Sequence, residues 1–418
     1  MGRIPKALKP GHMQEFTAAV LCAAGAEKVV SNELKKCIPP ESGNRKGNLS
    51  FLESGYGRVR FKTDLAGLYR ALLSLRAADR LLLEAGAFPA ADFDALFEGT
   101  AQIPWEHFVP RGLGLTVSKV RSNRSQLRAE TSIQAMVHKA AAKRLCDKYG
   151  MNRLPDPGPD GREAELRVYL EKDEALVYLD LSGSPLFKRG YRPTGGMAPL
   201  RESTAAAIIL LSGWRRKFPL YDPLCGSGTI VIEAAMYAWD MAPGLGRNFA
   251  LSALAFGDRQ LEETIRRELA EKVDFTRRFR ICGSDADEKA ISLAQANLRR
   301  ALSLAGPAAG KSGDTAGIDL RVLPMEKANA DFFAGPSAQN EPGFIITNPP
   351  YGKRLGDPAE AEARYREMSR LGTAFPGWKL ALITDHAGFE SHFGKKADSC
   401  RELKSGAVDA YLYQYEKL

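Results

Sequence analysis

The chain has 418 residues, of which 44% are hydrophobic and 26% charged, and its formal net charge is +9 at pH 7. This length is more than one hydrophobic core usually fills, so we expect two or three domains. No apolar run is long enough to span a bilayer, and the N-terminus lacks the apolar core of a signal peptide. Residues 1–14 are expected to form a disordered tail.

Nearly all of the excess positive charge lies in the first half of the chain. Residues 1–192 contain 30 Lys/Arg against 22 Asp/Glu, whereas the remainder contains 29 against 28. A basic region beside a neutral one favours a polyanionic substrate that is held away from the reaction centre. A solvated surface without a specific partner is the alternative.

The cysteine pattern gives no sign of a metal site. The six cysteines are far apart and form no C-x-x-C pair, and the five histidines are scattered. We therefore expect no bound metal and a reduced protein in the cytoplasm.

The N-terminal part predicts a small α+β module. Apolar spacing predicts a strand over 16–22, a helix over 26–37, a strand over 57–63 and a helix over 65–75. Asp64 can cap the last helix, because its carboxylate can accept hydrogen bonds from the free N–H groups of the first turn. These elements leave the topology open.

A basic segment follows, with a strand over 112–121 and a helix over 132–149. Between Arg111 and Arg153 there are ten Lys/Arg and two acids. Short polar residues among the arginines suit hydrogen bonds to phosphate oxygens, which position nucleic acid without reading its sequence. RNA is therefore the expected partner, with a merely solvated basic face as the alternative. The candidate RNA contacts are Lys119, Arg121, Arg124, Arg128, Lys139, Lys143 and Arg144.

The second half predicts alternating strands and helices. A hairpin over 165–181 precedes a connecting segment and an apolar helix over 199–214. Strands follow at 217–221, 279–283, 318–323, 343–347, 380–384 and 408–415, and helices at 230–239, 259–273 and 288–302. This order is typical of a mostly parallel sheet.

A glycine turn lies between the strand over 217–221 and the next helix, in the sequence L-Y-D-P-L-C-G-S-G-T. Glycine allows positive φ and lets a ligand approach the main chain. A Walker loop is excluded because no lysine follows Gly228, and a dinucleotide loop would need a third glycine where Val231 stands. The turn resembles the S-adenosylmethionine loop of class I methyltransferases. The candidate cofactor residues are Asp222, Pro223, Cys225, Gly226, Ser227, Gly228 and Thr229.

An acid at the end of the second strand can accept hydrogen bonds from both ribose hydroxyls of an adenosine, and Asp285 is the candidate. It lies much further from the glycine turn than the ~20 residues of a compact dinucleotide unit, so we expect an insertion between them. Asp287 is the alternative, although we expect it to cap the following helix.

A second motif, N-P-P-Y from Asn348, directly follows an apolar strand. The side-chain oxygen of Asn348, which also borders the cofactor, and the carbonyl of Pro349 can accept both hydrogens of an exocyclic amino group. Pro349 and Pro350 provide no backbone donor. Tyr351 offers a ring on which a flipped base can stack. Lys353 and Arg354 could hold a substrate phosphate or form salt bridges.

Longer stretches resemble one bacterial family, which joins a THUMP RNA-binding region to a class I methyltransferase domain. They are L-F-K-R-G-Y-R, A-P-L-R-E-S, D-P-L-C-G-S-G-T-I-V-I-E-A-A-M, M-A-P-G-L-G-R-N-F and N-P-P-Y-G-K-R-L. The most similar members methylate guanine N2 of 23S ribosomal RNA. The resemblance implies a ferredoxin-like segment over 15–60, a THUMP region over 60–165, a hairpin and linker over 166–198, and a Rossmann-like methyltransferase domain over 199–418.

The resemblance also implies S-adenosylmethionine as the cofactor and an acid near the adenine amino group. Glu326, in L-P-M-E-K-A, is only an approximate match for that acid. Three alternatives remain: a transfer RNA guanine-N2 methyltransferase, an adenine-N6 DNA methyltransferase and a non-enzymatic RNA-binding protein. The residues themselves do not specify the target nucleotide or the oligomeric state.

Overall fold

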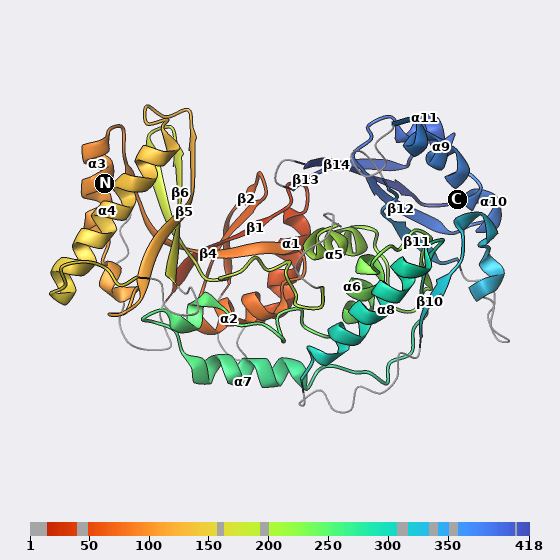
Figure 1. Ribbon diagram of the computed structural model, residues 1–418, viewed down its shortest axis with the longest axis horizontal. Coiled ribbons are helices and arrows are strands. Elements are labelled where there is room, and N and C mark those ends of the chain that lie inside the picture. The colour runs from red at the N-terminus through yellow and green to blue at the C-terminus, as the bar shows by residue number, and fades with distance from the viewer. Residues whose placement is uncertain are drawn as a thin grey trace.

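The computed structural model describes residues 15–39, 49–156, 163–192, 200–306, 317–333, 342–350, 358–405 and 408–418. These residues form an elongated molecule built around two sheets (Figure 1). Helices α3 (Phe93–Gln102) and α4 (Glu130–Tyr149) lie at one end, and α9 (Pro358–Met368) lies at the other. The expected tail, residues 1–14, falls outside the described residues.

The first sheet has seven strands in the order β2-β3-β1-β4-β7-β6-β5. Its neighbours are antiparallel except β5 and β6, which are parallel. The long strand β4 joins the predicted ferredoxin-like and RNA-binding parts into one sheet, because it pairs with β1 on one side and β7 on the other. The strands are β1 (Phe16–Cys22), β2 (Ser50–Gly55), β3 (Arg58–Thr63), β4 (Ala78–Pro89), β5 (Gly114–Asn123), β6 (Glu163–Glu171) and β7 (Glu174–Asp180).

Helices α1 (Glu27–Cys37) and α2 (Leu65–Ser74) pack in this half together with α3, α4 and the short 3₁₀ helix η1 (Trp105–His107). Helix α1 buries Val29, Val30 and Leu34, which recur on one face. The predicted cap of α2 is confirmed, since Asp64 Oδ1 accepts a hydrogen bond of 2.7 Å from the Gly67 N–H. The strands and helices expected in this half are present.

The second sheet has the order β10-β9-β8-β11-β12-β14-β13. Strands β8 to β12 are parallel, and β14 and β13 add an antiparallel hairpin, so the predicted Rossmann-like fold is confirmed. The strand order reverses between β8 and β11, which is where ligands bind in open α/β sheets. The strands are β8 (Leu220–Asp222), β9 (Ile281–Asp285), β10 (Ile318–Val322), β11 (Phe344–Thr347), β12 (Lys379–Thr384), β13 (Ser399–Ser405) and β14 (Val408–Tyr415).

The connections of the second half include both long helices and single turns. The α-helices are α5 (Glu202–Leu211), α6 (Thr229–Ala238), α7 (Arg259–Ala270), α8 (Glu288–Ser303), α9, α10 (Leu371–Ala374) and α11 (Phe389–Phe393). Short 3₁₀ turns are η2 (Ala250–Ala253), η4 (Met325–Lys327) and η5 (Ala330–Phe333). None of the helices in the described part of the chain combines the length and apolarity needed to cross a bilayer.

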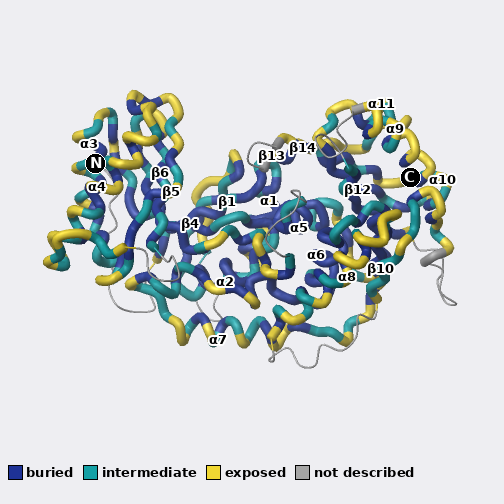
Figure 2. The backbone as a smooth tube through the Cα atoms, in the orientation of Figure 1, coloured by how far each residue is buried: buried dark blue, intermediate teal, exposed yellow. Residues whose placement is uncertain are grey.

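The two halves share one buried core, which runs through the middle of the molecule (Figure 2). The guanidinium of Arg76 donates a hydrogen bond of 2.7 Å to the Met241 carbonyl, and the Gly244 N–H donates one of 2.9 Å to the Leu73 carbonyl. An antiparallel bridge also joins Ala24 to Lys404. The second sheet is therefore anchored to the first by backbone contacts as well as by packing.

Candidate active site

The two sequence motifs meet at the carboxyl edge of the second sheet. Strands β8 and β11 pair in parallel, with Leu220 opposite Phe344 and Tyr221 opposite Ile345. The Thr347 hydroxyl, at the end of β11, donates a hydrogen bond of 2.7 Å to Oδ1 of Asp222, at the end of β8. The glycine turn and the N-P-P segment, distant in sequence, thus begin side by side.

The glycine turn connects β8 to α6 through two residues with positive φ, Gly226 at +51° and Gly228 at +80°. A Cβ on Gly226 would meet no atom within 4 Å, whereas a Cβ on Gly228 would lie 2.9 Å from the Cβ of Ala294 in α8. Gly226 therefore faces open space, and Gly228 allows α8 to pack against the turn. The turn ends at the N-terminus of α6, and it holds the predicted residues Asp222, Pro223, Cys225, Gly226, Ser227, Gly228 and Thr229.

Asp285 lies at the end of β9 and contacts the glycine turn directly. Its Oδ2 accepts a hydrogen bond of 3.0 Å from the Gly226 N–H, and its Oδ1 accepts one of 3.0 Å from the Asp287 N–H. Asp287 caps α8 as expected, since its Oδ1 accepts a hydrogen bond of 2.9 Å from the Lys289 N–H. Of the two candidate acids, Asp285 is the one that borders the turn.

Asp222 is a buried carboxyl at the centre of this edge. Burial raises its pKa from 3.8 to about 7, and the charge of Asp285 adds to the rise. Hydrogen bonds from the Thr347 hydroxyl and the Leu224 N–H lower the pKa and so offset part of this rise. This carboxyl therefore changes its protonation state near neutral pH.

Three further side chains support the turn, and sequence reasoning did not assign them to this task. Arg192 pairs with Glu202 through two hydrogen bonds of 2.8 and 2.5 Å. The same guanidinium donates to the Thr229 hydroxyl at 3.3 Å. Asn297 on α8 donates a hydrogen bond of 3.0 Å to the Ser227 carbonyl. Arg192 stands in the L-F-K-R-G-Y-R stretch, but no local pattern links Asn297 to the turn.

Asn348 carries a buried acceptor at the end of β11. Its Oδ1 is buried and accepts no hydrogen bond from the described part of the chain. Pro349 is buried and Pro350 is half-buried, and neither has an N–H to offer. Buried polar atoms are nearly always satisfied, and Asn348 Oδ1 is one of several in the described part of the chain that are not; its place at the end of β11, beside the glycine turn, makes it a candidate acceptor for a bound donor.

Other predicted site residues lie further out or outside the described residues. Glu326 is exposed in η4, just beyond the carboxyl end of β10. Tyr351, Lys353 and Arg354 fall outside the described residues, so their places in the site stay predictions.

The basic candidates lie on β5, on α4 and in the turn between them. Arg124, Arg128 and Lys139 are exposed and have no ion pair among the described residues, and half-buried Lys119 has none either. The other three have acidic partners: Arg121 lies 3.4 Å from Glu130, Lys143 2.6 Å from Asp147 and Arg144 2.8 Å from Glu106.

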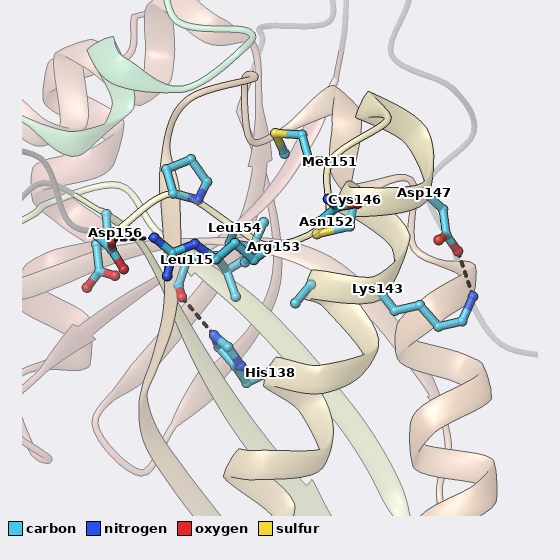
Figure 3. A pocket seen from close by; sticks show the side chains of 13 residues that line it. Leu115, His138, Lys143, Cys146, Asp147, Met151, Asn152, Arg153, Leu154 and Asp156 are labelled. Atoms are coloured by element: carbon cyan, nitrogen blue, oxygen red, sulfur yellow. Dashed lines mark hydrogen bonds and ion pairs between the residues drawn. The ribbon is translucent and has the colours of Figure 1, made fainter.

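An open pocket of about 730 Å³ lies beside α4, at the end of the molecule far from the glycine turn (Figures 1 and 3). His138 points from α4 toward the Leu115 carbonyl, with 3.1 Å between ring nitrogen and oxygen. Arg153 pairs with Asp156 at 3.2 Å at the opposite wall. Because Lys143 and Arg153 both have acidic partners here, the pocket does not present a uniformly positive wall.

Two sequence families match separate parts of the chain. Residues 189–414 match the RMKL-like methyltransferase domain, and residues 17–82 match the RlmL ferredoxin-like domain. Together these stretches contain the glycine turn, the N-P-P segment and strands β1 to β3.

Whole-chain relatives carry names of RNA methyltransferases. The chain is 32% identical over 410 residues to YpsC of Bacillus subtilis, whose name proposes an RNA methyltransferase, and the match covers 96% of both chains. It is 31% identical over 400 residues to the ribosomal RNA large subunit methyltransferase K/L of Syntrophotalea carbinolica, covering 94% of this chain and 52% of that protein. The chain spans about half the length of the K/L relatives it matches.

Solved structures match over almost the whole chain. SMU.472, proposed to be a methyltransferase and complexed with S-adenosylhomocysteine, has 34% identity and a TM-score of 0.80, covering 96% of this chain and 98% of that one. A protein of Listeria monocytogenes, named as a predicted N6-adenine-specific DNA methylase, has 34% identity and a TM-score of 0.81, covering 96% of each chain. The likeness therefore extends over both sheets.

Proposed function

Because this chain belongs to the RMKL-like methyltransferase family, we propose that it transfers a methyl group to the exocyclic N2 amino group of a guanine in 23S ribosomal RNA. The family match covers the site described above, and the K/L relatives are named for large-subunit ribosomal RNA. The methyl donor is S-adenosylmethionine, in line with the S-adenosylhomocysteine of SMU.472. We place the enzyme in the cytoplasm.

The residues of the glycine turn fit this donor. When bound, S-adenosylmethionine supplies an electrophilic methyl group. Gly226 leaves open space in front of the main chain, and we assign the ribose hydroxyls to Asp285, which already borders that space. The N-terminus of α6 favours partial negative charge, which suits a carboxylate or the ribose oxygens. We assign the adenine amino group to Glu326, whose exposed carboxylate lies beyond the neighbouring strand.

The single observation that carries the proposed chemistry is the unpaired buried Oδ1 of Asn348. An exocyclic amino group has two hydrogens, and Asn348 Oδ1 together with the Pro349 carbonyl can accept both. This holds the nitrogen and directs its lone pair out of the base plane. Because the reaction is a direct displacement, orientation can supply as much as ~7–11 kcal/mol of the barrier reduction. The protein needs no covalent nucleophile for this reaction.

We assign substrate binding away from the site to the basic surface of the half that contains the first sheet. Arg124 and Arg128 are exposed cations in the turn between β5 and α4, and Lys139 is an exposed cation on α4. We propose that these side chains contact RNA phosphates and that residues 60–165 form the RNA-binding region. Lys353 and Arg354, which follow the N-P-P segment, are proposed to contact phosphates close to the target base.

A second candidate is an adenine-N6 methyltransferase acting on DNA. It is favoured by the name of the Listeria relative and by the fact that a pair of oxygen acceptors fits any planar amino group. The basic surface does not distinguish DNA from RNA, since both present phosphates.

Product analysis separates these possibilities. The full chain would be incubated with labelled S-adenosylmethionine and, in parallel, with 23S ribosomal RNA from a strain lacking this enzyme, with transfer RNA and with duplex DNA. We expect label in N2-methylguanosine from 23S RNA, identified by mass spectrometry of nucleosides. Label only in transfer RNA, or N6-methyladenine in DNA, would contradict the proposed substrate.

A further inference from the structure

Three metal-ligating side chains converge at the carboxyl edge of the second sheet, near the N-P-P segment. Glu362 comes from α9, His386 from the turn after β12, and His392 from α11. One ligand atom from each lies within 4.8 Å of the others. The sequence predicted no metal site, because these residues belong to three different elements and have no recognised ligand spacing.

The distances within this cluster fit a shared ion better than a direct contact. Glu362 Oε1 lies 3.9 Å from His386 Nε2 and 3.6 Å from His392 Nε2. Both separations are too long for hydrogen bonds. Around a tetrahedral ion with bonds of ~2.0–2.1 Å, neighbouring ligand atoms lie ~3.3 Å apart. The two separations from Glu362 exceed that spacing by about 0.6 and 0.3 Å, and the ligand atoms of the two histidines lie within 4.8 Å of each other.

The surrounding contacts hold the ligands in place from behind. Arg366 donates a hydrogen bond of 3.4 Å to the second carboxylate oxygen of Glu362, which leaves Oε1 for an ion. The ring of Tyr365 packs edge-on against His386 at 5.6 Å, and the two histidine rings lie 5.4 Å apart. The side chains of the three ligands are 21–31% exposed, so an ion can enter from solvent.

We propose that Glu362, His386 and His392 bind one divalent transition-metal ion, with Zn²⁺ as the fitting ion and water as the fourth ligand. Two imidazoles and one carboxylate suit such an ion. Mg²⁺ does not fit, because it demands an octahedral set of oxygens. Strand β12 is the parallel neighbour of β11, and α9 is the first helix after the N-P-P segment among the described residues. The ion would join that helix to the turn after β12.

One contact changes on binding. The Gly388 N–H donates a hydrogen bond of 3.1 Å to Nδ1 of His386, so the neutral ring carries its proton on Nε2. Coordination through Nε2 moves this proton to Nδ1 and breaks the bond from Gly388. The tautomer of His386 is therefore a direct signature of the site.

Calorimetry of the untagged full chain tests the site without any methyl-transfer assay. The protein would be stripped with a chelator and titrated with ZnCl₂, and with MgCl₂ as the control ion. We expect one Zn²⁺ per chain, at least tenfold weaker binding in His392→Ala and Glu362→Gln, and no Mg²⁺ binding. His138→Ala, which removes a histidine on α4, should leave Zn²⁺ binding unchanged. Equal Zn²⁺ affinity in all variants, or no binding by the wild type, would overturn the proposal.

Nuclear magnetic resonance of ¹⁵N-histidine-labelled protein gives the second readout, with His386→Gln used for assignment. We expect the Nε2–H form without metal and the Nδ1–H form after one equivalent of Zn²⁺. A ring that keeps its proton on Nε2 in the presence of Zn²⁺ would exclude His386 as a ligand. Neither experiment requires RNA or S-adenosylmethionine, so either outcome is independent of the proposed function.

Discussion

The glycine turn and the carboxyl ends of β8, β9 and β11, together called the crevice below, use polar side chains in the opposite way to the basic surface around α4. In the crevice, Asp222, Asp285 and Arg192 form hydrogen bonds within or next to a buried network. On the basic surface, Arg124 and Arg128 extend into solvent without ion pairs in the described part of the chain. The crevice is thus pre-organised for one ligand geometry, whereas the basic surface offers charges that tolerate many ligand geometries. We expect substitutions to have large, specific effects in the crevice and small, salt-dependent effects on the surface.

The largest effect is expected at Asn348. Replacing it with alanine removes a buried acceptor that has no donor among the described residues and lies at the end of β11, beside the glycine turn. We expect kcat for methyl transfer to fall by about 10²–10³-fold, comparable to the loss of one oriented polar group in other active sites. The dissociation constant for S-adenosylmethionine, measured by calorimetry, should change little. Asn32→Ala, on the exposed face of α1, is the matched control and should keep full activity.

Asp222 should give the crevice an unusual pH dependence of stability. Its folded pKa is raised from 3.8 to about 7, so folding favours its protonated form. This contribution is fully present below pH 3.8 and is lost as the pH rises through about 7. At ~1.36 kcal/mol per unit of pKa, the loss amounts to about 4 kcal/mol.

Denaturant unfolding of wild type and Asp222→Asn between pH 4 and 8 measures this contribution. The free energy of unfolding of the wild type should fall relative to the variant over this range, since asparagine does not titrate. Parallel curves for the two proteins would show that Asp222 keeps an ordinary pKa.

Arg192 should affect cofactor binding more than the chemical step. Arg192→Lys keeps the charge but loses the paired geometry toward Glu202 and the contact with Thr229. We expect KM for S-adenosylmethionine to rise about tenfold while kcat stays within about twofold, because the turn is held less firmly. Thermal melting would detect a general loss of stability. A fall in kcat with unchanged KM would argue against a role in positioning the turn.

The crevice was more predictable from the sequence than its supports. The glycine turn and the N-P-P segment each follow a short apolar strand, and parallel strands bring their carboxyl ends to one edge. Arg192 and Asn297 could not be assigned, because their contacts with the turn depend on how separate elements pack. For the same reason, the sequence did not predict that Glu362, His386 and His392 would lie together.

Strand β4 was not predicted from the sequence, for a different reason. Its sequence, A-D-R-L-L-L-E-A-G-A-F-P, lacks the alternation of a half-buried strand. The structure gives the reason: Leu81, Leu82 and Leu83 are all buried, and the register toward β7 shifts between Glu84 and Gly86. A bulge of this kind interrupts the two-residue period. The central strand of the first sheet was therefore missed, although its neighbours were found.

The smallest effects are expected on the basic surface, where two arginines allow a matched test. Arg128 is exposed without an ion pair among the described residues, whereas Arg144 donates hydrogen bonds of 3.1 and 2.8 Å to a mostly buried Glu106. Arg128→Ala should weaken RNA binding about threefold and leave the thermal stability unchanged. The slope of the logarithm of the RNA binding constant against the logarithm of salt concentration should decrease by about the amount expected for one phosphate contact.

Arg144→Ala should instead lower the free energy of unfolding by about 1–3 kcal/mol, because it leaves the Glu106 carboxylate without its partner. The pKa of Glu106 is lowered by its hydrogen bonds from Arg144, which outweigh the effect of burial. This stabilisation is present above the ordinary carboxyl pKa and is lost as the pH falls through the lowered one. RNA titrations at several salt concentrations and melts of both variants measure the two effects. If Arg144→Ala changed the salt dependence as much as Arg128→Ala, with no loss of stability, Arg144 would belong to the RNA surface rather than to the framework.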